Sequence, residues 1–345
     1  DIVIGNNKKH ELPGLLRKYE EEKANGETEL AVIDINEKGQ PYEELFLKKT
    51  AEHTRAFIKV QDGCNQFCSY CIIPYARGRV RSRKTEDVLR EVEHLAQQGY
   101  KEVVLTGIHL SSFGVDTGDT LLHLIEEVHE VEGIERIRLG SLEPRIVTEE
   151  FAEKLAGMPK ICPHFHLSLQ SGCDATLKRM NRRYDTEEYA NKCEILRKYF
   201  KHPAITTDVI VGFPGETEEE FETTRAFLEN VHFYEMHIFK YSKRKGTKAA
   251  VMADQVPEDI KTKRSGRLLE REREMSEEFR KFYLGRTKEV LLEEEMELDG
   301  TRYFTGYTKE YVKVAVRADG HAANTMVRGR MERELSDGLY LMVEF

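Results

Sequence analysis

Residues 57–71 read FIKVQDGCNQFCSYC, and this stretch decides how the rest of the chain is interpreted. Its beginning, 57–60, is a short apolar run with β-branched residues, which is typical of a strand. Its end places Cys64, Cys68 and Cys71 within eight residues. A strand that runs directly into a group of thiols predicts a site loop at the carboxyl end of that strand.

The same strand pattern recurs along the chain, with amphipathic helical stretches between the strands. Further strands are predicted at 103–106, 136–139, 164–169, 206–211 and 234–239. Helices are predicted between them at 85–98, 120–130, 148–155, 186–199 and 217–230. Several of these helices open with Thr followed by Glu or Asp, which is an N-cap pattern. Strands that alternate with helices of this length predict a parallel α/β fold that carries its chemistry at the carboxyl ends of the strands.

The rhythm changes after residue 239. Residues 257–285 are heavily charged and helical in pattern. Beyond them, short strand-like runs are predicted at 290–294, 303–307, 311–316, 326–333 and 339–343. Asp-Gly pairs at residues 299, 319 and 337 separate several of these runs. This turn chemistry predicts a small antiparallel β-barrel at the carboxyl end of the chain.

Composition limits the classes of function. The chain has 345 residues, six cysteines and a formal net charge of -9. No apolar run approaches the length of a membrane span, so we expect no membrane partner and a cytoplasmic protein with reduced thiols. A net negative chain repels a polyanion, so binding to RNA would have to depend on local basic patches.

The three clustered cysteines have the spacing C-x3-C-x2-C. A structural zinc site recruits four ligands, commonly in pairs, and an ordinary 4Fe-4S carrier uses four thiolates. Three thiolates leave one iron open, which suits the binding of a substrate or cofactor. The alternatives are three unligated cysteines in a turn, an electron carrier, and a zinc-stabilised RNA-binding protein.

A longer series of motifs resembles the radical S-adenosylmethionine (SAM) superfamily and, within it, the methylthiotransferases. The motifs are GCNQFCSYCIIPYARG at 63–78, LTG at 105–107, SLEP at 141–144, HLSLQSG at 166–172, TDVIVGFPGET at 207–217 and YSKRKGT at 241–247. The resemblance implies a partial (β/α)6 radical SAM barrel followed by a small barrel of the TRAM type. The implied domains are 1–52, a remnant of an N-terminal domain with a connector; 53–255, the radical SAM core; 256–283, a helical linker; and 284–345, the TRAM domain.

The resemblance also implies the cofactors. A 4Fe-4S cluster would bind Cys64, Cys68 and Cys71, and its open iron would bind SAM. The residues implied to contact SAM are Tyr70, Gly107, Ser141, Glu143, Gln170, Arg182, Val211 and Phe213. No side chain is assigned as catalytic, because the radical is generated at the cluster. A reducing partner such as flavodoxin or ferredoxin is implied as well.

Within the family, segments 72–78 and 241–247 most resemble members that add a methylthio group to C2 of N6-threonylcarbamoyladenosine at position 37 of tRNA. The alternatives are isopentenyladenosine in tRNA and an aspartate of a ribosomal protein. Candidate RNA contacts are Arg77, Arg79, Arg81, Arg83, Lys243, Arg244 and Lys245. For most individual arginines, ion pairing on the surface is the alternative interpretation.

Residues 1–8 resemble the tail of an N-terminal domain that carries three more cysteines and a second 4Fe-4S cluster. We therefore expect most of that domain to be missing from this chain. On this interpretation the chain binds one cluster and cleaves SAM but is impaired in methylthio transfer.

Overall fold

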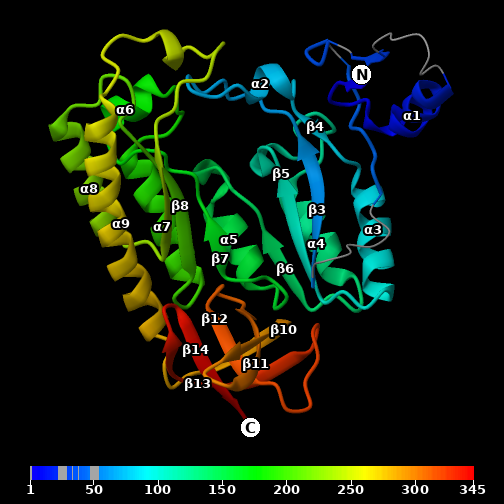
Figure 1. Ribbon diagram of the computed structural model, residues 1–345, viewed down its shortest axis with the longest axis vertical. Coiled ribbons are helices and arrows are strands. Elements are labelled where there is room, and N and C mark those ends of the chain that lie inside the picture. The colour runs from blue at the N-terminus through cyan, green and yellow to red at the C-terminus, as the bar shows by residue number, and fades with distance from the viewer. Residues whose placement is uncertain (1, 22–28, 33, 38, 47–53) are drawn as a thin grey trace.

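The computed structural model describes residues 2–21, 29–32, 34–37, 39–46 and 54–345. In this part of the chain, six parallel strands follow one another in sequence order and curl into an open half-barrel (Figure 1). They are β3 (Arg55–Asp62), β5 (Glu102–Gly107), β6 (Arg136–Leu139), β7 (His164–His166), β8 (Ala204–Val211) and β9 (Glu235–Lys240). These are the six strands that the sequence predicted.

The half-barrel consists of two hydrogen-bonded sheets, β4-β3-β5-β6 and β7-β8-β9. Isolated parallel bridges between Ile137 and Ile161 and between Leu142 and Leu167 connect them. The short strand β4 (Arg81–Ser82) pairs antiparallel with β3 and forms the edge. The carboxyl ends of β3 and β5–β9 therefore meet at one end of the half-barrel.

Helices cover the convex face of the half-barrel. They are α3 (Thr85–Gln97), α4 (Leu121–Glu130), α5 (Glu149–Ala156), α7 (Thr186–Tyr199) and α8 (Glu218–Val231). Strand residues such as Ile58, Leu105 and Phe165 are fully buried in one core with helix residues such as Leu95 and Leu124. Burial of this apolar area is the main favourable term that holds strands and helices together.

Shorter elements lie near the carboxyl ends of the strands. They are the helices α2 (Ile73–Ala76) and α6 (Asp174–Arg179) and the 3-10 turns Leu110–Ser112, Pro144–Ile146 and Ala249–Val251. The sequence pattern predicted neither α2 nor α6, because each is too short to show a helical period.

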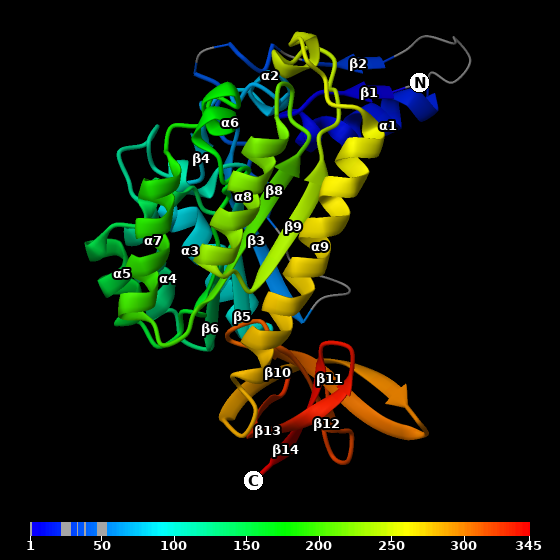
Figure 2. The same cartoon turned by 90° about the vertical axis from the view of Figure 1, so that its left-hand side faces the viewer.

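The long helix α9 (Glu258–Lys281) runs beside β9 and leads into the last five strands (Figure 2). These are β10 (Thr287–Leu298), β11 (Thr301–Thr308), β12 (Lys313–Arg317), β13 (Met326–Ser336) and β14 (Leu339–Glu344), which close into a barrel in the order β10-β11-β12-β14-β13. The prediction that this C-terminal barrel is antiparallel was wrong for one pair, because β12 and β14 are parallel. A closed barrel with an odd number of strands must contain at least one parallel pair.

The C-terminal barrel closes the end of the half-barrel opposite the cysteine loop (Figure 1). Arg136 donates to the carbonyls of Tyr307 and Glu289 at 2.8 Å, and Arg138 donates to the carbonyl of Lys309 at 3.0 Å. Both guanidinium groups also pair with Glu102, at 3.6 and 2.8 Å. All three charged side chains are buried, so the stability of the junction depends on their mutual pairing.

The N-terminal segment contributes a parallel pair of short strands, β1 (Ile2–Ile4) and β2 (Glu29–Ala31), with a 3-10 turn (Lys9–Glu11) and α1 (Leu12–Glu21) between them. It lies near α2, where the Asn6 amide donates to the carbonyl of Ala76 at 2.6 Å. The end of the predicted segment 1–52, residues 47–52, lies outside the described residues. No helix in the described part of the chain is long and apolar enough to cross a bilayer.

Candidate functional site

The cysteine loop leaves the end of β3 through a turn that only glycine fits. Gly63 has φ +71°, and a Cβ atom there would lie 1.8 Å from the carbonyl oxygen of Arg79. The next amide, from Cys64, donates to the carbonyl of Gly78 at 3.1 Å. The first cysteine is therefore fixed against the segment that follows the loop.

The middle of the loop is anchored on the end of α6. Ser69 donates its backbone N–H to the carbonyl of Met180 at 2.9 Å and its hydroxyl to the carbonyl of Arg179 at 2.8 Å. The Asn181 amide donates to the carbonyl of Phe67 at 2.9 Å. The start and the middle of the loop are thus held in place, and the three thiols line one cavity of about 140 Å³.

Hydrogen-bond donors already point at two of the sulfurs. The backbone N–H of Gln66 donates to Sγ of Cys64 at 3.4 Å, and Nη1 of Arg182 donates to Sγ of Cys68 at 3.3 Å. Burial raises the pKa of the Cys64 thiol to about 11 and also raises the pKa of Cys71. These thiols therefore need a cation, such as a cluster iron, to become thiolates at neutral pH.

The opposite wall of the cavity comes from the strand ends. Ser141 shares a hydrogen bond with Ser168 at 2.8 Å, and the Glu143 carboxylate accepts from Arg145 at 2.8 Å. Gln170 is 8% exposed and has φ +77°, a conformation that costs a non-glycine residue about 1–2 kcal/mol. This strain at the cavity wall is typical of functional positions.

Arg182 is the cation of this cavity. Its Nε donates to the hydroxyl of Tyr184 at 2.8 Å, and Nη2 donates to the carbonyl of Ser168 at 3.2 Å. These contacts fix the guanidinium beside Cys68 and leave a positive charge in the wall of the cavity.

A second cavity, of about 570 Å³, adjoins the first. Both cavities are lined by Tyr70, Cys71, Ile73 and Gln170. The second extends along β8 and β9 to Asp208, Ile210, Phe239, Lys240, Tyr241, Ser242 and Arg244. The thiols thus lie beside a small polar cavity that continues into a larger one, which is the arrangement needed for two adjacent ligands.

Not every predicted SAM contact lines these cavities. Tyr70, Ser141, Glu143, Gln170 and Arg182 do line them. The other three predicted contacts, Gly107, Val211 and Phe213, do not.

The positions of those three residues explain why. Gly107 packs against Gln61, Val211 is buried in the core, and Phe213 contacts the rings of Tyr70 and Tyr241 with centroids at 6.3 and 5.4 Å. They support the cavity walls from behind.

Sequence reasoning missed Gln61. This fully buried side chain donates to the carbonyls of Asp62 and Gly63, both at 2.7 Å, and accepts from the N–H of His109 at 2.7 Å. It therefore ties the start of the cysteine loop to the loop after β5. The only signal in the sequence was a polar residue at the end of an apolar strand.

Two of the predicted RNA contacts are internal. Arg81 is 3% exposed and lies 3.6 Å from Asp62. Arg83 is equally buried, and pairs with Glu91 and, at 2.9 Å, with Glu44. Arg83 is paired with carboxylates of the chain and Arg81 is buried beside one, so we leave both out of the candidate RNA surface.

The other candidates are more accessible. Arg79 is exposed, with its guanidinium 4.5 Å from the centroid of the Phe67 ring, and Arg77 is half-buried 3.9 Å from Asp62. Residues 243–245 are exposed, and the middle one, Arg244, also lines the second cavity. A candidate surface for phosphates is thus present at the rim, on both sides of the cysteine loop.

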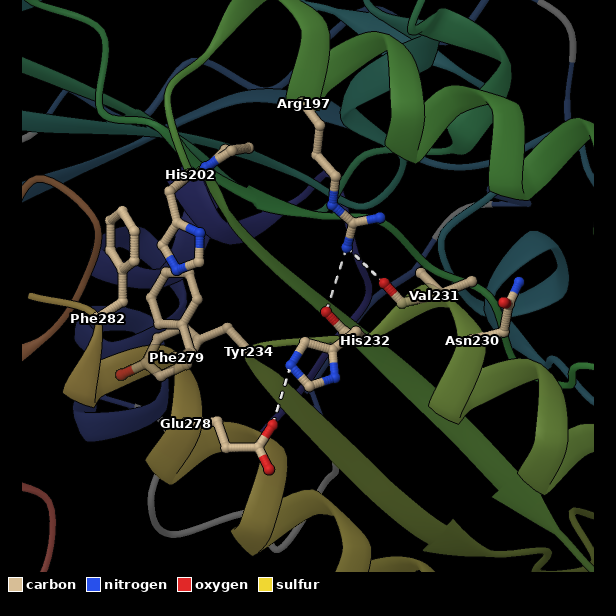
Figure 3. Close-up of a pocket in the computed structure, with 10 residues that line it drawn as sticks. Arg197, His202, Asn230, Val231, His232, Tyr234, Glu278, Phe279 and Phe282 are labelled. Carbon is tan, nitrogen blue, oxygen red and sulfur yellow. Dashed lines mark hydrogen bonds and ion pairs between the residues drawn. The ribbon is translucent and has the colours of Figure 1, made fainter.

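A third cavity, of about 500 Å³, lies at the joint between α7, α8 and α9, and it shares no lining residue with the other two (Figure 3). Several of its polar groups pair with one another: Arg197 donates to the carbonyls of Val231 and His232, and His232 lies 3.3 Å from Glu278. The His202 ring stacks on Phe282 with centroids 3.8 Å apart. We interpret this third cavity as a gap in the packing between the helices beside the C-terminal barrel.

A parallel half-barrel with a three-cysteine loop at its carboxyl edge defines the class of radical SAM proteins. The family model described as Radical SAM superfamily matches residues 58–228. The chain is 42% identical over 322 residues to threonylcarbamoyladenosine tRNA methylthiotransferase MtaB of Bacillus subtilis, a match that covers 92% of this chain and 70% of the relative. It is 39% identical over 334 residues to tRNA-2-methylthio-N(6)-dimethylallyladenosine synthase of Acetivibrio thermocellus, covering 96% and 68%. The chain belongs to the radical SAM methylthiotransferase family, whose members use a 4Fe-4S cluster and SAM.

Solved structures are more distant. Radical SAM methyltransferase TsrM from Kitasatospora setae, with cobalamin and a [4Fe-4S] cluster bound, aligns with a TM-score of 0.49 and 19% identity over 57% of this chain and 38% of that chain. Coproporphyrinogen III oxidase HemN from Escherichia coli aligns with a TM-score of 0.46 and 15% identity over 63% and 52%.

Proposed function

We propose that this methylthiotransferase acts on tRNA and adds its methylthio group to C2 of N6-threonylcarbamoyladenosine at position 37. The observation that carries the proposal is the polar part of the wall of the second cavity, where Asp208 and Arg244 lie beside the cysteine loop. A threonylcarbamoyl arm carries urea N–H groups, a hydroxyl and a carboxylate, which such side chains can pair. The 42% identity to a relative with this named substrate supports the same choice.

We infer that Cys64, Cys68 and Cys71 hold the cluster. The fit rests on three thiols that line one cavity and on two donors that already point at sulfur. When bound, the cluster and SAM supply a 5′-deoxyadenosyl radical that removes a hydrogen atom from the substrate.

Side chains of the chain would position the cofactor. Arg182, fixed by Tyr184 and the carbonyl of Ser168, offers a cation to the SAM carboxylate. Ser141, Glu143 and Gln170 offer hydrogen-bond partners on the facing wall, and Tyr70 lies between the two cavities. Gly107, Val211 and Phe213 act indirectly by supporting these walls.

We also propose a division of the chain into domains. Residues 1–52 are an N-terminal segment with a connector, 53–255 the radical SAM core, 256–283 the linker and 284–345 a TRAM-like domain. The rings of Tyr307 and Tyr311 in that last domain lie at the junction with the half-barrel, 5.2 and 5.3 Å from the guanidinium of Arg55. RNA contacts of the C-terminal barrel would therefore fall to exposed arginines such as Arg317, Arg328 and Arg330. Electrons would come from a flavodoxin or ferredoxin.

One observation favours isopentenyladenosine as a second candidate substrate. The same cavity also has apolar lining from Ile72, Ile73, Ile210 and Phe239, which would suit an alkyl arm. The 39% identical relative is named for a dimethylallyl substrate. A ribosomal-protein aspartate is the third candidate, without a specific observation in its favour.

The test uses the cluster-loaded chain and short anticodon stem-loop RNAs deuterated at C2 of the target adenosine. The RNAs carry the threonylcarbamoyl arm, the isopentenyl arm or no arm. We expect deuterium to appear in 5′-deoxyadenosine with the threonylcarbamoyl RNA, and no 5′-deoxyadenosine from Cys68→Ala. This readout follows hydrogen abstraction and does not require sulfur insertion. Deuterium transfer from the isopentenyl RNA alone would refute the proposed substrate.

A further inference from the structure

Three polar side chains from adjacent strands meet on the concave face of the half-barrel. They are His166 at the end of β7, Asp208 in β8 and His237 in β9, and their ligand-type atoms all lie within 4.8 Å of one another. Nε2 of His166 lies 3.3 Å from Oδ2 of Asp208. The two imidazole rings stack, with centroids 5.7 Å apart and planes 27° apart.

Strand register produces this group. Asp208 pairs with His237 across β8 and β9, and His166 pairs with Thr206, two residues before Asp208. Because side chains alternate along a strand, Thr206 and Asp208 point to the same face. On this face Thr206 is buried, Asp208 is half-buried and His237 is exposed, so solvent exposure increases from β7 and β8 toward β9.

The group is continuous with the candidate site. Asp208 lines the larger cavity together with Tyr70, Cys71 and Gln170. The backbone N–H of Gln170 donates to the carbonyl of Asp208 at 2.8 Å. Ile210, the next residue of β8 on the same face, lies about 7 Å further toward the thiols, at a rise of about 3.4 Å per residue. A ligand that enters beside the cysteines therefore meets this group next.

The far side of the group is closed. The His164 ring stacks on the Tyr311 ring of the C-terminal barrel, with centroids 4.8 Å apart. The guanidinium of Arg138 lies 4.8 Å from the centroid of the Tyr311 ring. The His166, Asp208 and His237 group is thus the polar layer between the thiol cavity and this closed floor.

Contacts within the group determine which of its nitrogen and oxygen atoms remain available to a ligand. His166 uses one ring nitrogen toward Thr206, at 3.0 Å, and the other toward Asp208. The second carboxylate oxygen of Asp208 and the ring nitrogens of His237 are the remaining acceptor and donor positions. They offer a ligand both an anion that accepts N–H or O–H and an imidazole that can donate.

We propose that His166, Asp208 and His237 form the subsite that binds the polar arm of the modified adenosine, an amino-acid-derived substituent with N–H, hydroxyl and carboxylate groups. Asp208 accepts from the N–H or hydroxyl of the arm, and His237 donates to its carboxylate. An alkyl arm would cover these groups without pairing them, and a site built to hydrogen-bond its substrate rejects analogues that lack the partner. The subsite rests on the proposed function and adds the residues that set its specificity.

The test compares His237→Phe, which keeps an aromatic ring against His166, with Asp208→Asn and His237→Gln. His123→Phe on the outer helix α4 is the matched control. Binding of the three stem-loop RNAs is measured by fluorescence anisotropy, with 5′-deoxyadenosine formation in the absence of RNA as the check that the thiol site is intact. We expect His237→Phe and Asp208→Asn to weaken binding of the threonylcarbamoyl RNA at least about tenfold, because each variant leaves a polar group of the bound arm without its hydrogen-bond partner. Binding of the RNA without an arm is unchanged, and His237→Gln restores part of the loss.

Two results would overturn the subsite. One is unchanged discrimination among the RNAs in both His237→Phe and Asp208→Asn. The other is one equivalent of zinc or iron bound to a Cys64→Ala, Cys68→Ala, Cys71→Ala chain and lost on adding His237→Phe, because the group would then be a metal site. If the wild-type chain itself prefers the isopentenyl RNA, the proposed function fails first. If it prefers the threonylcarbamoyl RNA and the variants keep that preference, only the subsite fails.

Discussion

Gly63→Ala is expected to disable the cysteine loop, and the size of the effect follows from geometry. A Cβ at residue 63 would lie 1.8 Å from the carbonyl oxygen of Arg79, whereas ordinary contact begins at 3.4 Å, so the backbone must move about 1.6 Å (3.4 − 1.8). The left-handed φ adds about 1–2 kcal/mol of strain, and forced overlap typically costs about 1–3 kcal/mol. The combined loss of unfolding free energy is about 2–5 kcal/mol.

The displaced segment carries the carbonyl of Gly78, which holds Cys64, while Ser69 remains anchored on Met180. The first thiol therefore shifts relative to the other two. Misplacement of about 1 Å can cost about a hundredfold in rate, so we expect SAM cleavage to fall by about that factor together with iron content.

Gly99→Ala is the matched control, because Gly99 also has a left-handed φ, +91°, but has no atom within 4 Å of the added Cβ. It should carry the strain alone, about 1–2 kcal/mol, and retain its iron. The assays are urea unfolding, iron per chain after anaerobic reconstitution, and 5′-deoxyadenosine per iron. Equal stability and equal iron content in the two variants would refute the reasoning that close approach at residue 63 shapes the loop.

Three further predictions concern separate parts of the chain. Burial would raise the pKa of Glu102, yet Arg138 holds this pKa below the ordinary value of 4.5, so the ionised carboxylate contributes fully to stability above pH 4.5 and loses that contribution as the pH falls further. Glu102→Gln should lower the free energy of unfolding in urea by about 3–5 kcal/mol at pH 7 and should flatten the fall in stability at acid pH. An unchanged fall in stability at acid pH would contradict this. Cys68→Ala should lose reconstituted iron, whereas Cys193→Ala, buried in α7, should keep it; equal iron in both would argue against the assigned ligands. Thr217→Ala removes the capping box of α8 and should cost about 1 kcal/mol in the same unfolding assay, with no effect on iron.

Local patterns in the sequence predicted much of the half-barrel, because buried parallel strands must be apolar runs and their helices must be amphipathic. The capping prediction, Thr followed by Glu or Asp, was confirmed at Thr148 and Thr217. It failed at Thr85, where the N-cap position is Lys84 and no side chain caps the helix, and at Thr186, where Asp185 is the cap. The sequence does not say which of two adjacent residues is the last one outside the helix. The short cysteine spacing likewise predicted one site loop.

Contacts between distant residues were not predictable in this way. The junction of Arg136, Arg138 and Glu102 with the C-terminal barrel joins residues more than one hundred positions apart, and nothing local marks an arginine in a strand as buried. The same limit explains why two of the predicted RNA contacts, Arg81 and Arg83, proved to be internal.

By itself the sequence determined the strand and helix order, the cysteine loop and the family, since these depend on residue type and short-range spacing. Only the tertiary structure decided which polar side chains share a cavity. Gln170 and Arg182 reach the thiols because their strand ends and α6 lie beside the cysteine loop, and the register of β7, β8 and β9 brings His166, Asp208 and His237 together. Register is set by packing across the whole sheet, which no local stretch of sequence encodes.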